Sequence, residues 1–182
     1  AELMHLTCAA AVAMCDAVEK IAGFRPGAKW INDLVYDGRK LGGILTEMSL
    51  DKGGIDYAIV GIGINCCQTV TDFPAPLQDM AGSLSMVTGR DISPAALAAA
   101  IMEALSSMSS HLLTDKAAIM DRYRSGCITL GQEVSLHRAG CVTHARAVGI
   151  DNEGALLVCH PDGRTEAVNS GEASVRGMYG YV

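Results

Sequence analysis

The chain has 182 residues, of which 49% are apolar and 19% charged, and its formal net charge is −6. This composition is typical of a folded protein and excludes an intrinsically disordered chain. The negative total provides no general field that would attract nucleic acid, so nucleic-acid binding is not indicated in this chain.

The first predicted element is an alanine-rich helix. Apolar residues recur at helical spacing over 3–21, which predicts an amphipathic helix over 2–22. Its charged residues argue against a signal peptide, and no apolar stretch is long and pure enough to span a bilayer, so no membrane association is predicted. Because Ala1 lies inside this helical pattern, we expect the chain to be the C-terminal portion of a longer protein.

Four strands are predicted next, at 28–30, 33–37, 40–49 and 56–64. The pair Asp37-Gly38 predicts a tight hairpin turn, because glycine accepts the positive φ of the turns that match strand twist. The segment 55–64 is almost continuously apolar, which predicts a central strand buried on both faces.

Helices are predicted after a loop over 66–82. A short helix is expected near 83–88, and Ser93 followed by Pro94 predicts the start of a longer helix that runs to about 113. Asp115 is positioned to cap a further helix that ends near 124. The middle of the chain is therefore predicted to be helical.

The pattern changes after Gly126 to short strands separated by tight turns. These strands are predicted at 132–137, 143–150, 154–159, 164–169 and 173–176. About fifty residues of this kind are typical of a small β-barrel. We therefore expect an α+β portion over 1–125 followed by a barrel over 127–182.

The seven cysteines lack the paired spacing of a disulfide framework or a zinc site, which favours reduced thiols in a cytoplasmic protein. His137, Cys141 and His144 come closest to a metal cluster, but we expect them to be ordinary residues of a short β segment. Cys66 and Cys67 are adjacent, and no catalytic partner is indicated for them.

The segment 29–48 carries the groups that are most suited to chemistry, namely two lysines, an Asn-Asp pair and a Gly-Gly step. Lys40 is either a solvated turn lysine or a cation that faces developing negative charge. Asn32 and Asp33 either bond their own backbone or bind a nucleotide and its Mg²⁺.

Glycine inside a strand lowers the stability of the sheet, so the Gly42-Gly43 pair indicates a structural or functional requirement at this point. The alternatives are a β-bulge, a ligand pressed against the backbone, or the close approach of a neighbouring helix. Gly61 and Gly63 raise the same question on the next predicted strand.

These motifs resemble those of biotin protein ligases. The resemblance rests on Lys-Trp-Ile-Asn-Asp at 29–33, Arg-Lys-Leu-Gly-Gly at 39–43 and Gly-Ile-Gly-Ile-Asn at 61–65, and the predicted elements follow the family's order. It implies a mixed sheet flanked by helices over 1–125 and an SH3-like barrel over 127–182. It also implies that biotin and ATP form biotinyl-5′-adenylate, from which biotin passes to a lysine of the biotin carboxyl carrier domain of a carboxylase.

The same resemblance implies roles for individual residues. Lys40 would stabilise the adenylation transition state, and the glycines would form a narrow apolar slot for biotin. The residues implied are Lys40 for catalysis; Lys40, Gly43, Leu45 and Gly61 for biotin; and Lys29, Asn32, Asp33 and Asn65 for ATP, with Asp33 also holding Mg²⁺.

The resemblance also leaves alternatives open. The family has an arginine- and glycine-rich loop that closes over biotin and the adenylate upstream of the position of Ala1. The family's upstream half also contains strands, so we expect this chain to expose an unpaired sheet edge. A lipoate-type ligase resembles the same core and is a second enzyme hypothesis. A non-catalytic module that docks a carrier or a partner subunit is a third. The resemblance admits a homodimer.

Overall fold

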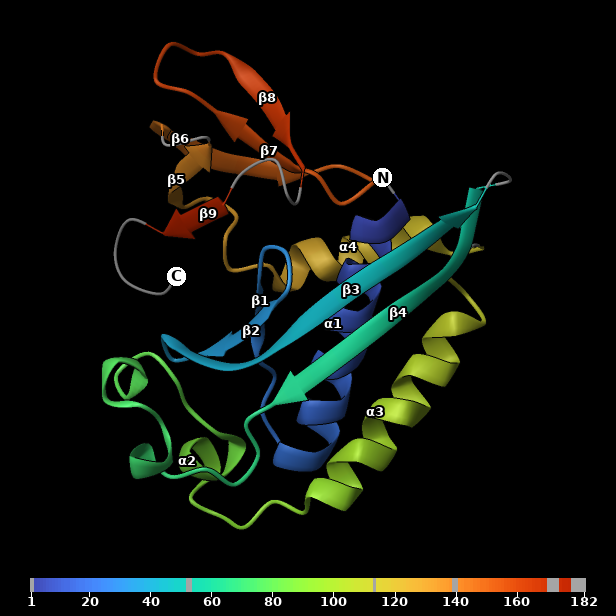
Figure 1. Cartoon of the computed structure of the whole chain (residues 1–182), viewed down its shortest axis with the longest axis vertical. Coiled ribbons are helices and arrows are strands. Elements are labelled where there is room, and N and C mark those ends of the chain that lie inside the picture. Colours follow the sequence, from blue (N-terminus) through green and yellow to red (C-terminus); the bar gives the residue numbers. More distant parts are fainter. Residues whose placement is uncertain (1, 52–53, 113, 139–140, 170–173, 178–182) are drawn as a thin grey trace.

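The computed structural model describes residues 2–51, 54–112, 114–138, 141–169 and 174–177, and its strands form two antiparallel sheets (Figure 1). The first sheet has the order β1 (Gly27–Lys29), β2 (Asp33–Tyr36), β3 (Arg39–Asp51) and β4 (Gly54–Ile64). The second has the order β8 (Thr165–Val168), β7 (Leu156–Cys159), β6 (Cys141–Ile150), β5 (Glu133–Arg138) and β9 (Ser174–Gly177). The predicted α+β class is confirmed.

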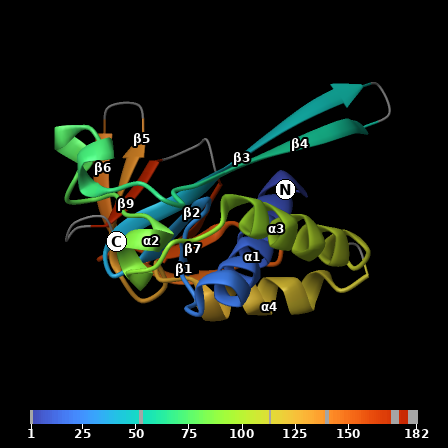
Figure 2. The same cartoon turned by 90° about the horizontal axis from the view of Figure 1, so that it is seen from below.

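The three longer helices cover one face of the first sheet (Figure 2). The helices are α1 (Glu2–Ala22), α2 (Leu84–Thr88), α3 (Pro94–Ser109) and α4 (Lys116–Gly126), and two 3₁₀ turns lie at Val70–Asp72 and Ala75–Leu77. None of the described helices combines the length and the apolar character that crossing a bilayer requires.

Helix α1 is the centre of the core. It packs against β3 on one side and against α3 and α4 on the others, so every residue over 8–15 is buried. The sequence predicted an amphipathic helix with one solvated side, whereas residues 8–15 are buried on all sides. The reason is its alanine content, because small side chains let neighbouring elements approach from several directions.

The turn between β2 and β3 forms as predicted at Asp37-Gly38. Asp37 has φ +48° and Gly38 has φ +70°, and the flanking residues Tyr36 and Arg39 pair across the hairpin. Two successive positive φ values define the primed turn that suits the right-handed twist of the strands.

Strand β4 is an edge strand, so the prediction of a central strand buried on both faces is wrong. Within the described part of the chain β4 pairs only with β3, and Tyr57 and Ile59 are each 55% exposed. Val60 and Ile62 pack against the core from the opposite face. Figure 2 shows the β3–β4 ribbon extending beyond the helices. The expected unpaired sheet edge is confirmed.

The second sheet is open in the residues that the structure describes. Its outermost strands are β8 and β9, and these two do not pair with each other there. The predicted run of short antiparallel strands is confirmed, whereas the predicted closure into a barrel is not observed.

Trp30 links the two sheets. Its backbone N–H donates to Oγ1 of Thr129 at 2.9 Å, and its indole Nε1–H donates to the carbonyl oxygen of Gly154 at 2.8 Å. The side chain is 6% exposed and belongs to a cluster of buried residues drawn from both sheets. Trp30 is therefore a core residue, as predicted. Because the sheets share this core, the division into 1–125 and 127–182 stays a proposal.

Replacing Trp30 with phenylalanine should destabilise the protein. The change leaves the buried carbonyl of Gly154 without its donor, which costs about 1–3 kcal/mol. The melting temperature should then fall by roughly 2–4 °C for each kcal/mol in a protein of this size. Tyr57→Phe is the control, because Tyr57 is exposed and its change should stay within about 0.5 kcal/mol. Equal melting temperatures for the two variants would contradict the linking role of Trp30.

Candidate functional site

One row of residues crosses all four strands of the first sheet. Lys29 pairs with Asp33, Asp33 pairs with Gly43, and Gly43 pairs with Gly63. Directly opposed residues have Cβ positions about 4.5–5.5 Å apart. The register therefore places a lysine, a carboxylate and two positions of bare backbone next to one another.

Lys40 and Asp33 form an ion pair beside this row. Nζ of Lys40 lies 2.5 Å from Oδ1 of Asp33, and the two side chains are 38% and 14% exposed, respectively. Lys29 is half-buried and adjoins Asp33 on its other side. Two predicted ATP-binding residues and the predicted catalytic lysine thus lie together.

A β-bulge determines the face on which Lys40 lies. The register shifts so that Gly42 opposes Leu34 while Lys40 opposes Val35, which leaves Leu41 as the extra residue. In a regular strand Lys40 and Gly43 would point to opposite faces, because they are an odd number of positions apart. The extra residue brings both to the same face. A bulge is thus present next to the Gly-Gly pair, but its extra residue is Leu41, so the bulge does not itself explain the two glycines.

Gly42 and Gly43 serve different purposes. A Cβ atom at Gly42 would collide with the carbonyl oxygen of Gly63 and crowd Ile64, so glycine here allows β3 and β4 to approach. A Cβ atom at Gly43 would lie 3.3 Å from Oδ1 of Asp33 and 3.5 Å from Nζ of Lys40. Gly43 therefore leaves room for the ion pair.

The described chain does not itself require glycine at Gly61 or Gly63. A Cβ atom at Gly61 would meet only the carbonyl oxygen and Cβ of Leu45, at 3.6 and 3.8 Å, which are ordinary contacts. A Cβ atom at Gly63 would come no nearer than 4.0 Å to the carbonyl oxygen of Gly43. The absence of side chains at these positions instead suits a ligand that lies against the backbone.

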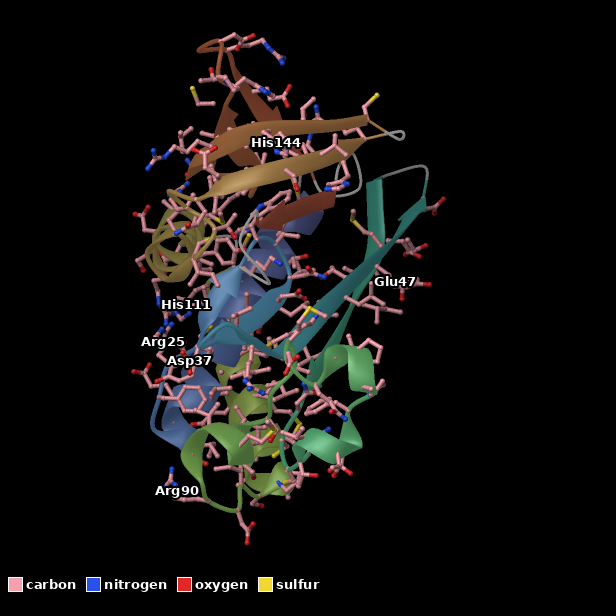
Figure 3. The ribbon with its side chains drawn as sticks, turned by 90° about the vertical axis from the view of Figure 1, so that its left-hand side faces the viewer. Arg25, Asp37, Glu47, Arg90, His111 and His144 are labelled. Carbon is pink, nitrogen blue, oxygen red and sulfur yellow. The ribbon has the colours of Figure 1, made fainter. Side chains whose placement is uncertain are left out.

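Four residues of β3 and β4 lie on the face of the sheet opposite the helices and form a surface that we call the floor; it comprises Gly43, Leu45, Gly61 and Gly63. Leu45 pairs with Gly61 and is 63% exposed. Glu47 follows two positions later on the same strand and projects outward from it (Figure 3). The predicted biotin residues Gly43, Leu45 and Gly61 are thus neighbours, and Lys40 lies over one end of the floor.

The segment 80–82, which we call the strap, holds the backbone of Lys40. The N–H of Lys40 donates to the carbonyl oxygen of Met80 at 2.7 Å, and the N–H of Gly82 donates to the carbonyl oxygen of Lys40 at 2.9 Å. Arg39 reinforces the strap, because its Nη1 donates to the carbonyl oxygen of Ala81 at 3.4 Å. The sequence did not predict this contact, because the loop 66–82 carries no periodic pattern.

Asn65 connects the strap to the end of β4. Its Nδ2 donates to the carbonyl oxygen of Gly82 at 2.9 Å and to that of Lys40 at 3.4 Å. The predicted ATP-binding residue therefore fixes the surroundings of Lys40, and direct contact with ATP stays a prediction.

Asn32 bonds the backbone of β3. Its Nδ2 donates to the carbonyl oxygen of Ile44 at 3.0 Å, and its own carbonyl oxygen accepts from the N–H of Ile44 at 2.8 Å. The side chain of Asn32 thus bonds the backbone of a residue on β3, twelve positions away, and not its own local backbone as the alternative had it. Its remaining side-chain oxygen is the group that a nucleotide contact would use, and that contact stays a prediction.

A magnesium ion would find one carboxylate here, that of Asp33. In the part of the chain that the structure describes, no three histidine, cysteine or acidic side chains lie close enough to hold a metal. His144, one of the residues considered for a metal cluster in the sequence, belongs to the second sheet and lies away from the hairpin that carries Asp37 (Figure 3). Mg²⁺ in nucleotide sites commonly takes one or two carboxylates and completes its shell with phosphate and water, so Asp33 fits an ion that arrives with ATP.

Two family models match this chain. The model described as "Biotin/lipoate A/B protein ligase family" matches residues 1–65, which include the ion pair, all of β4 and Asn65. The model described as "Biotin protein ligase C terminal domain" matches residues 129–176, the region of the second sheet. The two matches lie in the order expected from the sequence.

Curated relatives show the same similarity. The "Bifunctional ligase/repressor BirA" of Bacillus subtilis is 34% identical over 158 residues, which cover 85% of this chain and 48% of that protein. The "Biotin--[acetyl-CoA-carboxylase] ligase" of Paracoccus denitrificans is 29% identical over 168 residues, covering 88% of this chain and 68% of that protein. The chain thus spans about half the length of the Bacillus relative.

Solved structures agree with this fold. The apo biotin protein ligase of Aquifex aeolicus matches with a TM-score of 0.85 and 26% identity, covering 97% of this chain and 76% of that one. The same ligase in complex with biotin and ATP matches with a TM-score of 0.82 and 26% identity, covering 97% and 72%.

Proposed function

The chain belongs to the biotin protein ligase family, and we propose that it carries the phosphate side of the active site of an ATP-dependent biotin–protein ligase. The observation that carries the proposal is the position of Lys40, which the bulge and the strap hold over the floor beside Asp33. The substrates would be biotin, ATP and a lysine of a biotin carboxyl carrier domain.

In the first step a carboxylate oxygen of biotin attacks the α-phosphorus of ATP, and pyrophosphate leaves. Two anionic groups approach each other, and the transition state concentrates negative charge around that phosphorus. The ammonium of Lys40 offsets this charge, and its backbone is already fixed by Met80 and Gly82, so only the side chain has to turn. Before the substrates bind, the ion pair with Asp33 holds the side chain of Lys40 at the site.

The floor would receive the apolar chain of biotin. Because Gly43 and Gly61 carry no side chains, the ligand can lie close to the backbone of the strands, and the exposed side chain of Leu45 provides an apolar contact. Lys29 and Asp33 belong to the row, and Asn32 and Asn65 lie on either side of it; all four would contact ATP. Asp33 would hold Mg²⁺, which when bound supplies positive charge that neutralises the phosphates.

In the second step the amine of the carrier lysine attacks the carbonyl carbon of the adenylate. The new amide bond forms as AMP leaves with the electrons of the broken anhydride bond, and the amine gives up a proton. We further propose that this takes place in the cytoplasm and that the protein forms a homodimer. The match of the biotin ligase C-terminal domain to 129–176 favours biotin over lipoate as the substrate.

Isotope exchange tests the proposal on the full-length natural protein. Labelled pyrophosphate should enter ATP when biotin is present, because adenylate formation is reversible. Lipoate in place of biotin should support no exchange above background. Exchange with lipoate alone would establish the lipoate-type alternative, and no exchange with either acid would favour a non-catalytic docking module.

A further inference from the structure

Two adjacent thiols, Cys66 and Cys67, directly follow Asn65. Cys66 is 9% exposed and Cys67 is exposed. Both thiols donate to the carbonyl oxygen of Ile92, at sulfur–oxygen distances of 3.6 and 3.1 Å, respectively. Successive side chains of an extended strand point to opposite faces, so the chain must bend here to bring both sulfurs to one acceptor.

The backbone around the two thiols is fixed. The N–H of Ser85 donates to the carbonyl oxygen of Cys66 at 2.9 Å, and the N–H of Leu84 donates to that of Asn65 at 2.9 Å. The buried Ser83, which caps α2, donates its hydroxyl to the carbonyl oxygen of Gln68 at 2.6 Å. The two thiols are therefore preorganised on the same side of a well-anchored segment.

We propose that Cys66 and Cys67 form a dithiol site that chelates a trivalent arsenical through both sulfurs. An organoarsenic(III) dihydroxide condenses with the two thiols. Two arsenic–sulfur bonds form, two arsenic–oxygen bonds break, and each departing hydroxyl leaves as water with one thiol proton. Arsenic stays trivalent, so no oxidant or reductant takes part.

The state of Cys66 favours this ligand over a soft metal ion. Burial raises the pKa of the Cys66 thiol to about 11, and its hydrogen bond with Cys67 adds to the rise. Metal ions bind thiolates, so they would have to remove a proton from a group that keeps it at neutral pH. Condensation with an arsenical consumes neutral thiols and buries no charge.

The spacing of the two residues also favours chelation over a disulfide. Consecutive Cα atoms across a trans peptide are about 3.8 Å apart, whereas those of a disulfide are usually at least about 4.4 Å apart. An arsenic atom between the sulfurs removes the need for a direct sulfur–sulfur bond. The bend that directs both thiols to Ile92 already points them in a common direction.

The other described cysteines do not offer such a site. Cys159 is half-buried, has no neighbouring cysteine in the chain, and donates to the carbonyl oxygen of His160 at 3.6 Å. Cys8, Cys15 and Cys127 belong to the buried core and, unlike Cys66, have no exposed cysteine next to them in the chain. Cys141 is exposed but stands alone in β6, which makes it a matched control for a single reactive thiol.

Phenylarsine oxide is the probe, applied to the reduced full-length protein. Intact-mass measurement should show one tight adduct, thiol titration should show two thiols fewer, and peptide mapping should place the arsenic on Cys66 and Cys67. Cys67→Ser should weaken binding by about 100-fold or more, because the second bond of a chelate forms at high effective concentration. Cys141→Ser should bind as the parent does.

Competition separates chelation from attachment to one thiol. Millimolar 2-mercaptoethanol should leave the adduct in place, whereas a small dithiol such as dimercaptopropanol should remove it. Unfolding curves should confirm that Cys67→Ser stays folded. Three results would overturn the proposal: an adduct that forms as tightly in Cys67→Ser as in the parent, an adduct that maps to Cys141, or an adduct that a monothiol displaces. So would a Cys66–Cys67 disulfide that persists under mild reduction.

Discussion

Replacing Lys40 with alanine should slow biotinyl-adenylate formation by about 100-fold or more, which is the typical effect of losing one electrostatic contact to a transition state. The backbone contacts of Lys40 with Met80 and Gly82 do not depend on its side chain, so the strap should remain in place. The loss should therefore appear in the rate of adenylate formation and not in folding. Single-turnover formation of biotinyl-adenylate by the full-length protein measures it directly.

Lys20→Ala is the matched control for this experiment. Lys20 is also an ion-paired lysine, but it bonds Glu103 on the helical side, where both side chains are largely exposed. Exposed ion pairs of this kind contribute about 0–1 kcal/mol, so the control should keep both its stability and its rate. A folded Lys40→Ala variant that forms the adenylate at the parent's rate would remove Lys40 from the mechanism.

The sequence predicted local features of the site well. The turn at Asp37-Gly38 could be predicted because its geometry depends on two residues that accept positive φ. The end of β4 at Ile64 could be predicted because the apolar run stops at the polar Asn65. Both features are set by neighbours in the chain, which a sequence shows directly.

The sequence could not show which face each residue occupies. Regular alternation places Lys40 and Gly43 on opposite faces, and only the bulge at Leu41 brings them together. A bulge of this kind depends on how two strands pair. The contact between the strap and Lys40 could not be predicted either, because it consists of backbone hydrogen bonds, which produce no pattern of side chains in the sequence.

The exposure of β4 could not be predicted for a related reason. An apolar strand shows that its side chains favour burial, but it does not show which element covers them. In the described chain one face packs on the core through Val60 and Ile62, while Tyr57 and Ile59 remain exposed on the other. The predicted barrel closure likewise depended on strand partners that short alternating segments do not specify.

Replacing Gly61 with valine should weaken biotin binding without unfolding the protein. The new Cβ would make only ordinary contacts with Leu45, and a β-branched residue suits a strand. Its two methyl groups would rise from the floor into the space assigned to the ligand. Overfilling a closely packed site costs about 1–3 kcal/mol. Biotin affinity should therefore fall by roughly 5- to 150-fold in a calorimetric titration of the full-length protein.

Gly42→Ala should show the opposite pattern and so serves as the matched comparison. Its Cβ would strike the carbonyl oxygen of Gly63 and crowd Ile64, which forces β3 and β4 apart. Stability should fall by about 1–3 kcal/mol, while the folded fraction should bind biotin nearly as the parent does. Thermal unfolding and biotin titration of both variants separate the two roles of glycine, since Gly42 serves strand pairing and Gly61 serves the ligand. If Gly61→Val melted early and bound biotin normally, the floor would not be the biotin site.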